Sequence, residues 1–256
     1  MRWSSLILSF SVIGSLLILF LLIPLISLFT GISLNDLMRY GLSEDALNAL
    51  CVALAASSMS TLILLLSGIP ISYVIARKGF AGRDLVRSLL DLPLVIPHGV
   101  AGIAILGAYN SRAPLGSLIA EVGIFVEDSF WGIVAVMCFV SAPLMVDTLV
   151  DGFLSVDQSL EHVARSLGAS EWRAFSSVTL PLASRSVVTA SLMSWARGIS
   201  EVGAILIVAY YPKSINVLIM DRFWTYGLEA AKATALPLLA ISMACFILLK
   251  RLSGRK

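Results

Sequence analysis

Long apolar stretches, separated by short polar ones, are the dominant pattern along the chain. A helix that crosses a bilayer needs about 20 mostly apolar residues. Six stretches reach this length, and the second and fifth are long enough to tilt or to extend past the bilayer. We therefore predict an all-α polytopic membrane protein with six transmembrane helices. The predicted spans are Leu6–Phe29, Leu47–Ala76, Leu89–Tyr109, Phe130–Val150, Val187–Tyr211 and Thr234–Leu252.

The composition agrees with this pattern. Of the 256 residues, 58% are hydrophobic and 13% are charged, whereas a soluble domain carries about 25% charged residues. The first apolar stretch is longer than the core of a secretory signal peptide and has no small-residue cleavage site after it, so we expect it to be retained. We expect one transmembrane domain over residues 1–256 in the cell membrane, with its first helix at about 6–29 and its core at about 46–252.

Lysines and arginines are unevenly distributed between the two sides of the predicted spans. The side that holds both termini carries 12 of the 18, the other side carries 5, and Arg197 falls within the fifth span. Because basic residues favour the cytoplasmic side of a membrane protein, we expect both termini in the cytoplasm. Lys213, Arg222 and Lys232 on the opposite side weaken the contrast. The net charge of +2 is too small to indicate a nucleic-acid partner.

The longest polar interruption of the pattern lies at residues 155–183. Ser155 is placed to cap a short helix, with Gln158 three residues later as its capping-box partner. Gly168 suits the left-handed position just past a helix end, and Ser170 is placed to cap a second short helix. The sequence therefore predicts two short helices that meet at a glycine on the cytoplasmic face.

The second short helix carries Trp172 and Phe175 on one side, and we expect both on the surface. Two interpretations fit residues 155–183: an amphipathic loop that lies on the membrane, or a rigid knob that docks into a partner. A glycine at position 168 favours the knob, because a residue without Cβ permits a close approach.

The same segment resembles the signature of the permease subunits of ABC importers, EAA-x3-G-x9-I-x-L-P. Gly168, Val178 and the Leu180–Pro181 pair match its second half, while His162 to Ala164 stand at the EAA positions with Glu161 one place early. The resemblance implies the type I importer permease fold, in which this coupling segment sits in a groove of a cytoplasmic ATPase subunit. It assigns to that contact Glu161, His162, Ala164, Gly168, Ala169, Trp172, Leu180 and Pro181.

Two further stretches, Leu92 to Leu106 and Ser194 to Pro212, resemble the oxyanion branch of these permeases, and the second is most similar to molybdate/tungstate permeases. The resemblance implies a homodimer with two cytoplasmic ATPase subunits and an external oxyanion-binding protein, surrounded by membrane lipid. It implies import of molybdate or tungstate. Another oxyanion, such as sulfate, is the alternative cargo, and an ion-coupled secondary transporter is the alternative class.

Charged residues within the spans are candidates for the translocation path. Arg197 and Glu201 are four apart and share a helix face; because charges inside a bilayer are costly, such residues usually pair inside a bundle. They form either a structural ion pair or one border of the path. Pro93 and Pro97 are expected to break the third helix. The residues assigned to the path are Pro97, His98, Arg197, Gly198, Glu201 and Gly203.

The chain lacks the motifs of common catalytic sites. It has no G-x4-G-K-[ST] loop for ATP phosphates, no G-x-S-x-G or H-E-x-x-H motif, and no paired histidines or cysteines at metal-ligand spacing. We expect no metal, no cofactor and no catalytic residue, so that any ATP is hydrolysed by a partner. An intramembrane enzyme would need a nucleophile and a base, and no such pair is visible.

Overall fold

The computed structural model describes residues 5–254, and within them the fold is all helical with no strand. Four helices are long and apolar enough to cross a membrane, so the protein is a multi-pass membrane protein. They confirm the first, second, fourth and sixth predicted spans. These helices are α1 (Ser5–Ser27), α3 (Glu44–Arg77), α7 (Phe130–Leu154) and α14 (Leu228–Gly254). Arg2, Arg255 and Lys256, which entered the charge count, lie outside the described residues.

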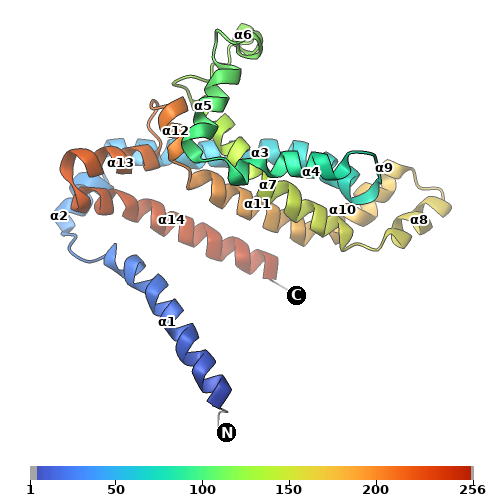
Figure 1. Ribbon diagram of the computed structural model, residues 1–256, viewed down its shortest axis with the longest axis horizontal. Helices are drawn as coiled ribbons and strands as arrows, with labels where there is room; N and C mark the ends of the chain where they lie inside the picture. Colours follow the sequence, from blue (N-terminus) through green and yellow to red (C-terminus); the bar gives the residue numbers. More distant parts are fainter. Residues whose placement is uncertain (1–4, 255–256) are drawn as a thin grey trace.

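Shorter elements connect these four helices. The remaining elements are α2 (Leu34–Asp36), η1 (Leu37–Gly41), α4 (Arg83–Val95), α5 (His98–Tyr109), α6 (Pro114–Glu121), α8 (Gln158–Ser166), α9 (Glu171–Ala174), η2 (Phe175–Thr179), α10 (Leu180–Leu182), α11 (Ser184–Ile199), α12 (Gly203–Val208) and α13 (Ile215–Tyr226). Both η elements are π-helical turns. In Figure 1, α8 and α9 lie at one end of the long axis, and α2 and α13 lie at the other.

The core of the molecule is the packing of α3, α7 and α11. Helix α7 is at its centre, with Ile133, Met137 and Leu149 fully buried. Gly152 of α7 contacts Ser186 of α11 so closely that a Cβ would not fit. Small residues therefore let these helices approach, as is common where packing rather than a hydrophobic driving force holds helices in a bilayer.

The third predicted span is not continuous. Helix α4 ends at Val95, α5 begins at His98, and the two helices are bent by 117°. Pro97 explains the break, since it has no N–H to donate and it forces Ile96 into an extended conformation. The expectation that Pro93 also breaks the helix is wrong, because α4 continues through it.

The fifth predicted span is also interrupted. Helix α11 ends at Ile199 and α12 begins at Gly203, which leaves carbonyl groups without helical partners. The side-chain amide of Asn216, on α13, donates to the carbonyl oxygens of Ile199 at 2.5 Å and Glu201 at 3.1 Å. With the bent α4–α5 pair counted as one span, the described residues contain five candidate spans rather than the six predicted.

Arg222 fastens the polypeptide that follows α1 to the rest of the molecule. The sequence places it in an outer loop, but the structure buries it on α13. Its guanidinium donates to the carbonyl of Tyr40 in η1, to Thr234 Oγ1 at 2.8 Å and to Ser43 Oγ at 2.9 Å. Helix α1 itself lies apart from the bundle (Figure 1), and its described side chains are exposed along most of its length.

Helix α5 packs against α12 through Gly102. A Cβ at this position would lie 2.9 Å from the carbonyl oxygen of Ala204 and 3.0 Å from Ile207 Cβ. Gly107, on the same helix, has no atom within 4 Å of that point. The two glycines therefore form a matched pair, one closely packed and one open.

We expect Gly102→Ala to destabilise the protein and Gly107→Ala to leave it unchanged or slightly more stable. The first substitution overpacks the contact with α12, at a cost of about 1–3 kcal/mol; the second removes a glycine from a helix interior. Thermal unfolding of the detergent-purified protein measures both. Equal melting temperatures for the two variants would contradict the close α5–α12 packing.

Candidate functional site

The coupling segment, residues 155–183, forms two short helices that meet at Gly168. This glycine has φ +92°, as the sequence predicts, and Ser170 caps α9 by accepting from the Arg173 N–H at 3.2 Å. The N-terminal cap of the first short helix, α8, differs from the prediction. Helix α7 extends far enough that Ser155 ends it, and Asp157 instead caps α8 by accepting from the Ser159 N–H at 2.8 Å.

Glu161 anchors this segment to α3. Its Oε1 accepts from Arg77 Nε at 2.7 Å and from Thr179 Oγ1 at 2.7 Å, and its Oε2 accepts from the Tyr73 hydroxyl at 2.9 Å. Arg77 also donates to the carbonyl of Val156 at 2.9 Å. Desolvation by burial raises the pKa of Glu161, but the hydrogen bonds from Thr179, Tyr73 and Arg77 outweigh it and hold the pKa below its usual value. The carboxylate is therefore ionised at neutral pH.

Two aromatic residues of the segment lie in different environments. Trp172 is 73% exposed, as expected. The expectation for Phe175 is wrong: it is buried, with its ring centroid 4.7 Å from that of Tyr73 and 6.1 Å from that of Phe153. The π-helical turn η2 begins at Phe175, so the periodicity of an α-helix no longer predicts which residues share a face.

The other residues assigned to the coupling segment lie on or near its surface. His162, Gly168 and Pro181 are exposed, whereas Ala164, Ala169 and Leu180 are half-buried. Space around Gly168 is open, with no atom within 4 Å of a built Cβ. The exposed part of the segment therefore projects from the molecule, and Glu161 anchors the segment to α3.

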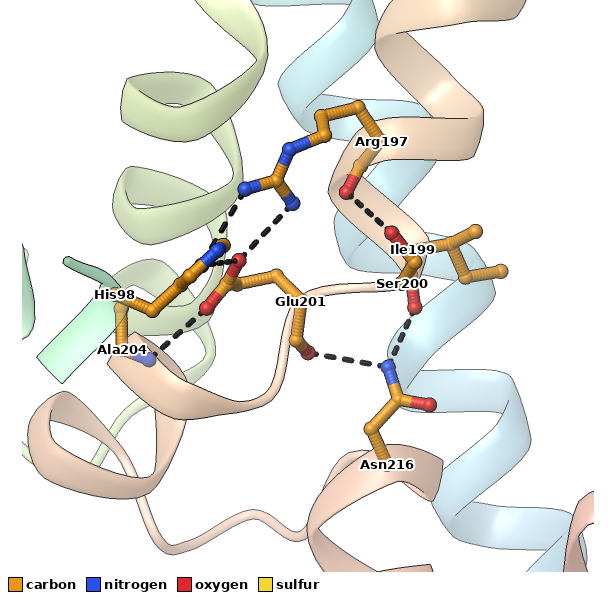
Figure 2. Close-up of polar contacts among 7 residues, drawn as sticks. All are labelled: His98, Arg197, Ile199, Ser200, Glu201, Ala204 and Asn216. Carbon is orange, nitrogen blue, oxygen red and sulfur yellow. Dashed lines mark hydrogen bonds and ion pairs between the residues drawn. The ribbon is translucent and has the colours of Figure 1, made fainter. Parts of the chain in front are cut away.

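A second group of charged side chains lies where the two interrupted helices meet (Figure 2). Arg197 Nη1 donates to Glu201 Oε2 at 3.0 Å, which confirms the predicted pairing of these two residues. The expectation that they share a helix face is wrong, because α11 ends at Ile199 and Glu201 follows it. His98, the first residue of α5, places Nδ1 2.7 Å from the same oxygen. We call Arg197, Glu201 and His98 the hinge cluster.

Glu201 also holds the start of α12. It lies in the break after α11, and its Oε1 accepts from the Ala204 N–H at 3.0 Å. Gly203 lets α12 approach His98, because a Cβ there would lie 2.9 Å from His98 Cβ. Pro97 precedes α5, and Gly198 lies deeper, beside Ser141 and Met137.

Sequence reasoning missed the partners that are distant along the chain. For the coupling segment these are Tyr73 and Arg77, and for the hinge cluster Asn216 is one. Within the segment, Thr179, 18 positions from Glu161, was missed as well. Asp147 of α7 is also paired, 3.6 Å from Arg87 of α4. In each case only an isolated charged or polar residue near an apolar stretch could have signalled the contact. The described residues contain no cluster of side chains that could hold a metal ion.

The chain matches a known protein family and relatives of nearly the same length. The family of the binding-protein-dependent transport system inner membrane component matches residues 68–255. A molybdate/tungstate transport system permease protein of Pyrococcus abyssi is 44% identical over 248 residues, which are 96% of this chain and 95% of that protein. The protein of the same name from Pyrococcus furiosus is 45% identical and covers 96% and 95% of the two chains.

Comparison with solved structures gives the same fold at low sequence identity. The crystal structure of a bacterial ABC transporter that imports the acidic polysaccharide alginate superposes with a TM-score of 0.73, covering 96% of this chain and 94% of that chain at 18% identity. This likeness confirms the type I importer permease fold predicted from the signature. The family match and the near-full-length relatives show that the chain belongs to the family of binding-protein-dependent transport system inner membrane components, the permease subunits of ABC importers.

Proposed function

We propose that this chain is the permease subunit of an ATP-driven importer of molybdate or tungstate. The observation that carries the proposal is the identity of 44–45%, over nearly the whole chain, with permeases named for these anions. The hinge cluster supports an anionic cargo, because its partly exposed members are an arginine and a histidine.

Selection between oxyanions belongs to the external binding protein in this proposal. Conduction requires an anion to bind weakly enough to leave, and in the hinge cluster a carboxylate already neutralises the arginine. A pore of this kind discriminates little between tetrahedral dianions, so the cargo delivered to it decides what is transported.

Two further partners are proposed. The first is a cytoplasmic ATPase subunit in contact with the coupling segment; since Glu161 ties this segment to Arg77 and Tyr73 of α3, movement of α8 and α9 would be passed to the bundle. The second is another copy of this chain. Helix α1 has no buried residue in its apolar window, and a homodimer would cover some of that surface.

The orientation follows from charge and from the position of the coupling segment. Arg77, Lys78, Arg165 and Arg173 belong to the α8–α9 end of the molecule, which we place in the cytoplasm together with both termini. Helix α6 and the start of α7 are then external.

Thiol labelling tests this orientation. The three cysteines are replaced by alanine, and single cysteines are introduced as Ser111→Cys and Ser253→Cys. In intact cells, an impermeant thiol reagent is expected to label position 111 and not position 253. Both positions should react in permeabilised cells, which controls for access. The reverse pattern in intact cells would place the termini outside.

Substitution of Glu161 tests the anchor of the coupling segment. We expect Glu161→Ala to lower the melting temperature and to reduce co-purification with the ATPase, because it leaves Arg77 buried without its carboxylate. Breaking a buried ion pair in this way costs about 3–5 kcal/mol. Glu171→Ala, on the same segment, is the matched control: its side chain is 67% exposed and lies 3.4 Å from Arg165, so its loss is expected to change little. Equal behaviour of the two variants would contradict the anchoring role.

Reconstitution tests the transport function. The permease, its ATPase and its binding protein are placed in liposomes, and uptake of labelled molybdate, tungstate and sulfate is followed. We expect molybdate or tungstate to accumulate only with ATP and binding protein both present. Uptake of sulfate alone would identify sulfate as the cargo. Uptake that persists without ATP would indicate an ion-coupled carrier.

A further inference from the structure

The hinge cluster has its charges arranged in order of depth. The side chain of Glu201 is 1% exposed, that of Arg197 is 22% exposed and that of His98 is 56% exposed. The carboxylate is thus the most buried of the three groups, and the two groups that can carry positive charge are more exposed. Figure 2 shows both of them beside the carboxylate. An anion that reached this surface would meet donors before it met the carboxylate.

The two oxygens of Glu201 have separate partners. Oε1 accepts from the Ala204 N–H at 3.0 Å and so caps α12, while Oε2 faces both Arg197 and His98. Rotation of Arg197 away from Oε2 would leave the cap in place. The ion pair can therefore open without unfolding the start of α12.

The donors of Arg197 are only partly used by the other described residues. A guanidinium has five N–H donors, and Glu201 accepts from Nη1 alone. Nη2 lies 3.4 Å from His98 Nδ1. The carboxylate of Glu201 is ionised in its pair with Arg197 and therefore only accepts hydrogen bonds. His98 Nδ1 thus carries the proton of its hydrogen bond to Glu201 and cannot accept one from Arg197 Nη2. Arg197 thus has donors available for a tetrahedral oxyanion, which provides several acceptor oxygens.

We propose that Arg197 and His98 form a transient binding site for the oxyanion cargo, and that Glu201 is the built-in counter-anion that the cargo displaces. The site lies at the joint of both interrupted helices, and the partial positive charge at the N-terminal end of α5, where His98 lies, adds to it. This inference rests on the proposed function, since it concerns the same anion.

An internal counter-anion keeps the site weak. If the Arg197–Glu201 pair is closed for 90–99% of the time, the apparent affinity for the cargo falls by about 10–100-fold. Such a site neutralises the arginine between transport cycles, accepts a dianion briefly and releases it when Glu201 returns. Removal of the carboxylate should therefore convert a weak site into a measurable one.

Equilibrium binding of labelled molybdate, tungstate and sulfate to the permease–ATPase complex in nanodiscs, without binding protein, tests this. We expect Glu201→Gln to bind the oxyanions at least about tenfold more tightly than the unsubstituted complex. The gain should disappear in the double variant Arg197→Gln/Glu201→Gln. Glu127→Gln, which removes an equal charge from a side chain hydrogen-bonded to Ser111 outside the cluster, should bind as the unsubstituted complex does.

Each result decides the proposal. A folded Glu201→Gln complex that binds no more tightly than the unsubstituted complex overturns it, as does a gain that survives loss of Arg197. If Glu201→Gln does not fold, Glu201→Ala, which also removes the counter-anion, is judged by the same criterion. The unsubstituted complex is assayed for ATP-driven uptake in parallel. Uptake of sulfate in place of molybdate and tungstate would refute the proposed cargo. The proposed anion site would then be judged by the binding of sulfate to the same variants.

Discussion

Inside a bilayer every backbone polar group and every charge must find its partner within the protein, and the arrangement of this chain follows from that requirement. Two of its spans are interrupted, which exposes carbonyl groups that a continuous helix would satisfy. Glu201 lies at one interruption and His98 at the other, and their hydrogen bond joins the two. Asn216 satisfies the carbonyls that remain after α11. The breaks are stable because they are assembled against each other.

A second buried carboxylate, Glu161, fixes the coupling segment to the bundle. Glu161 comes from a polar segment that would otherwise have few contacts with the bundle, and it accepts hydrogen bonds from Tyr73 and Arg77 of α3. A short hinged segment without such an anchor would move independently of the membrane helices. With it, the proposed push of an ATPase on α8 or α9 would be carried into α3 and then into α7, against which α3 packs.

The two carboxylates therefore have different roles, which their surroundings explain. Glu161 is buried and accepts hydrogen bonds from Tyr73, Arg77 and Thr179, so its contacts favour rigidity. Glu201 shares one oxygen with groups that remain accessible, so one of its contacts can be exchanged while the other persists. The proposed transmission of force needs the first arrangement, and the proposed passage of an anion needs the second.

The sequence by itself determined the features that depend on near neighbours. Apolar stretches of sufficient length marked the long helices, Gly168 marked a left-handed turn and Ser170 marked a cap. Each depends on residues a few positions apart, where backbone geometry alone sets the distance.

Only the tertiary structure decided how distant segments meet. His98 and Glu201 are separated by 103 in the sequence, and Arg77 and Glu161 by 84. Over such separations no periodic signal could predict either contact. The break after α11 likewise depends on Asn216, which arrives from a later helix, and the burial of Phe175 depends on the π-helical turn that begins there. These features are settled by packing, because an interruption or a buried charge is tolerated only where another part of the chain satisfies it.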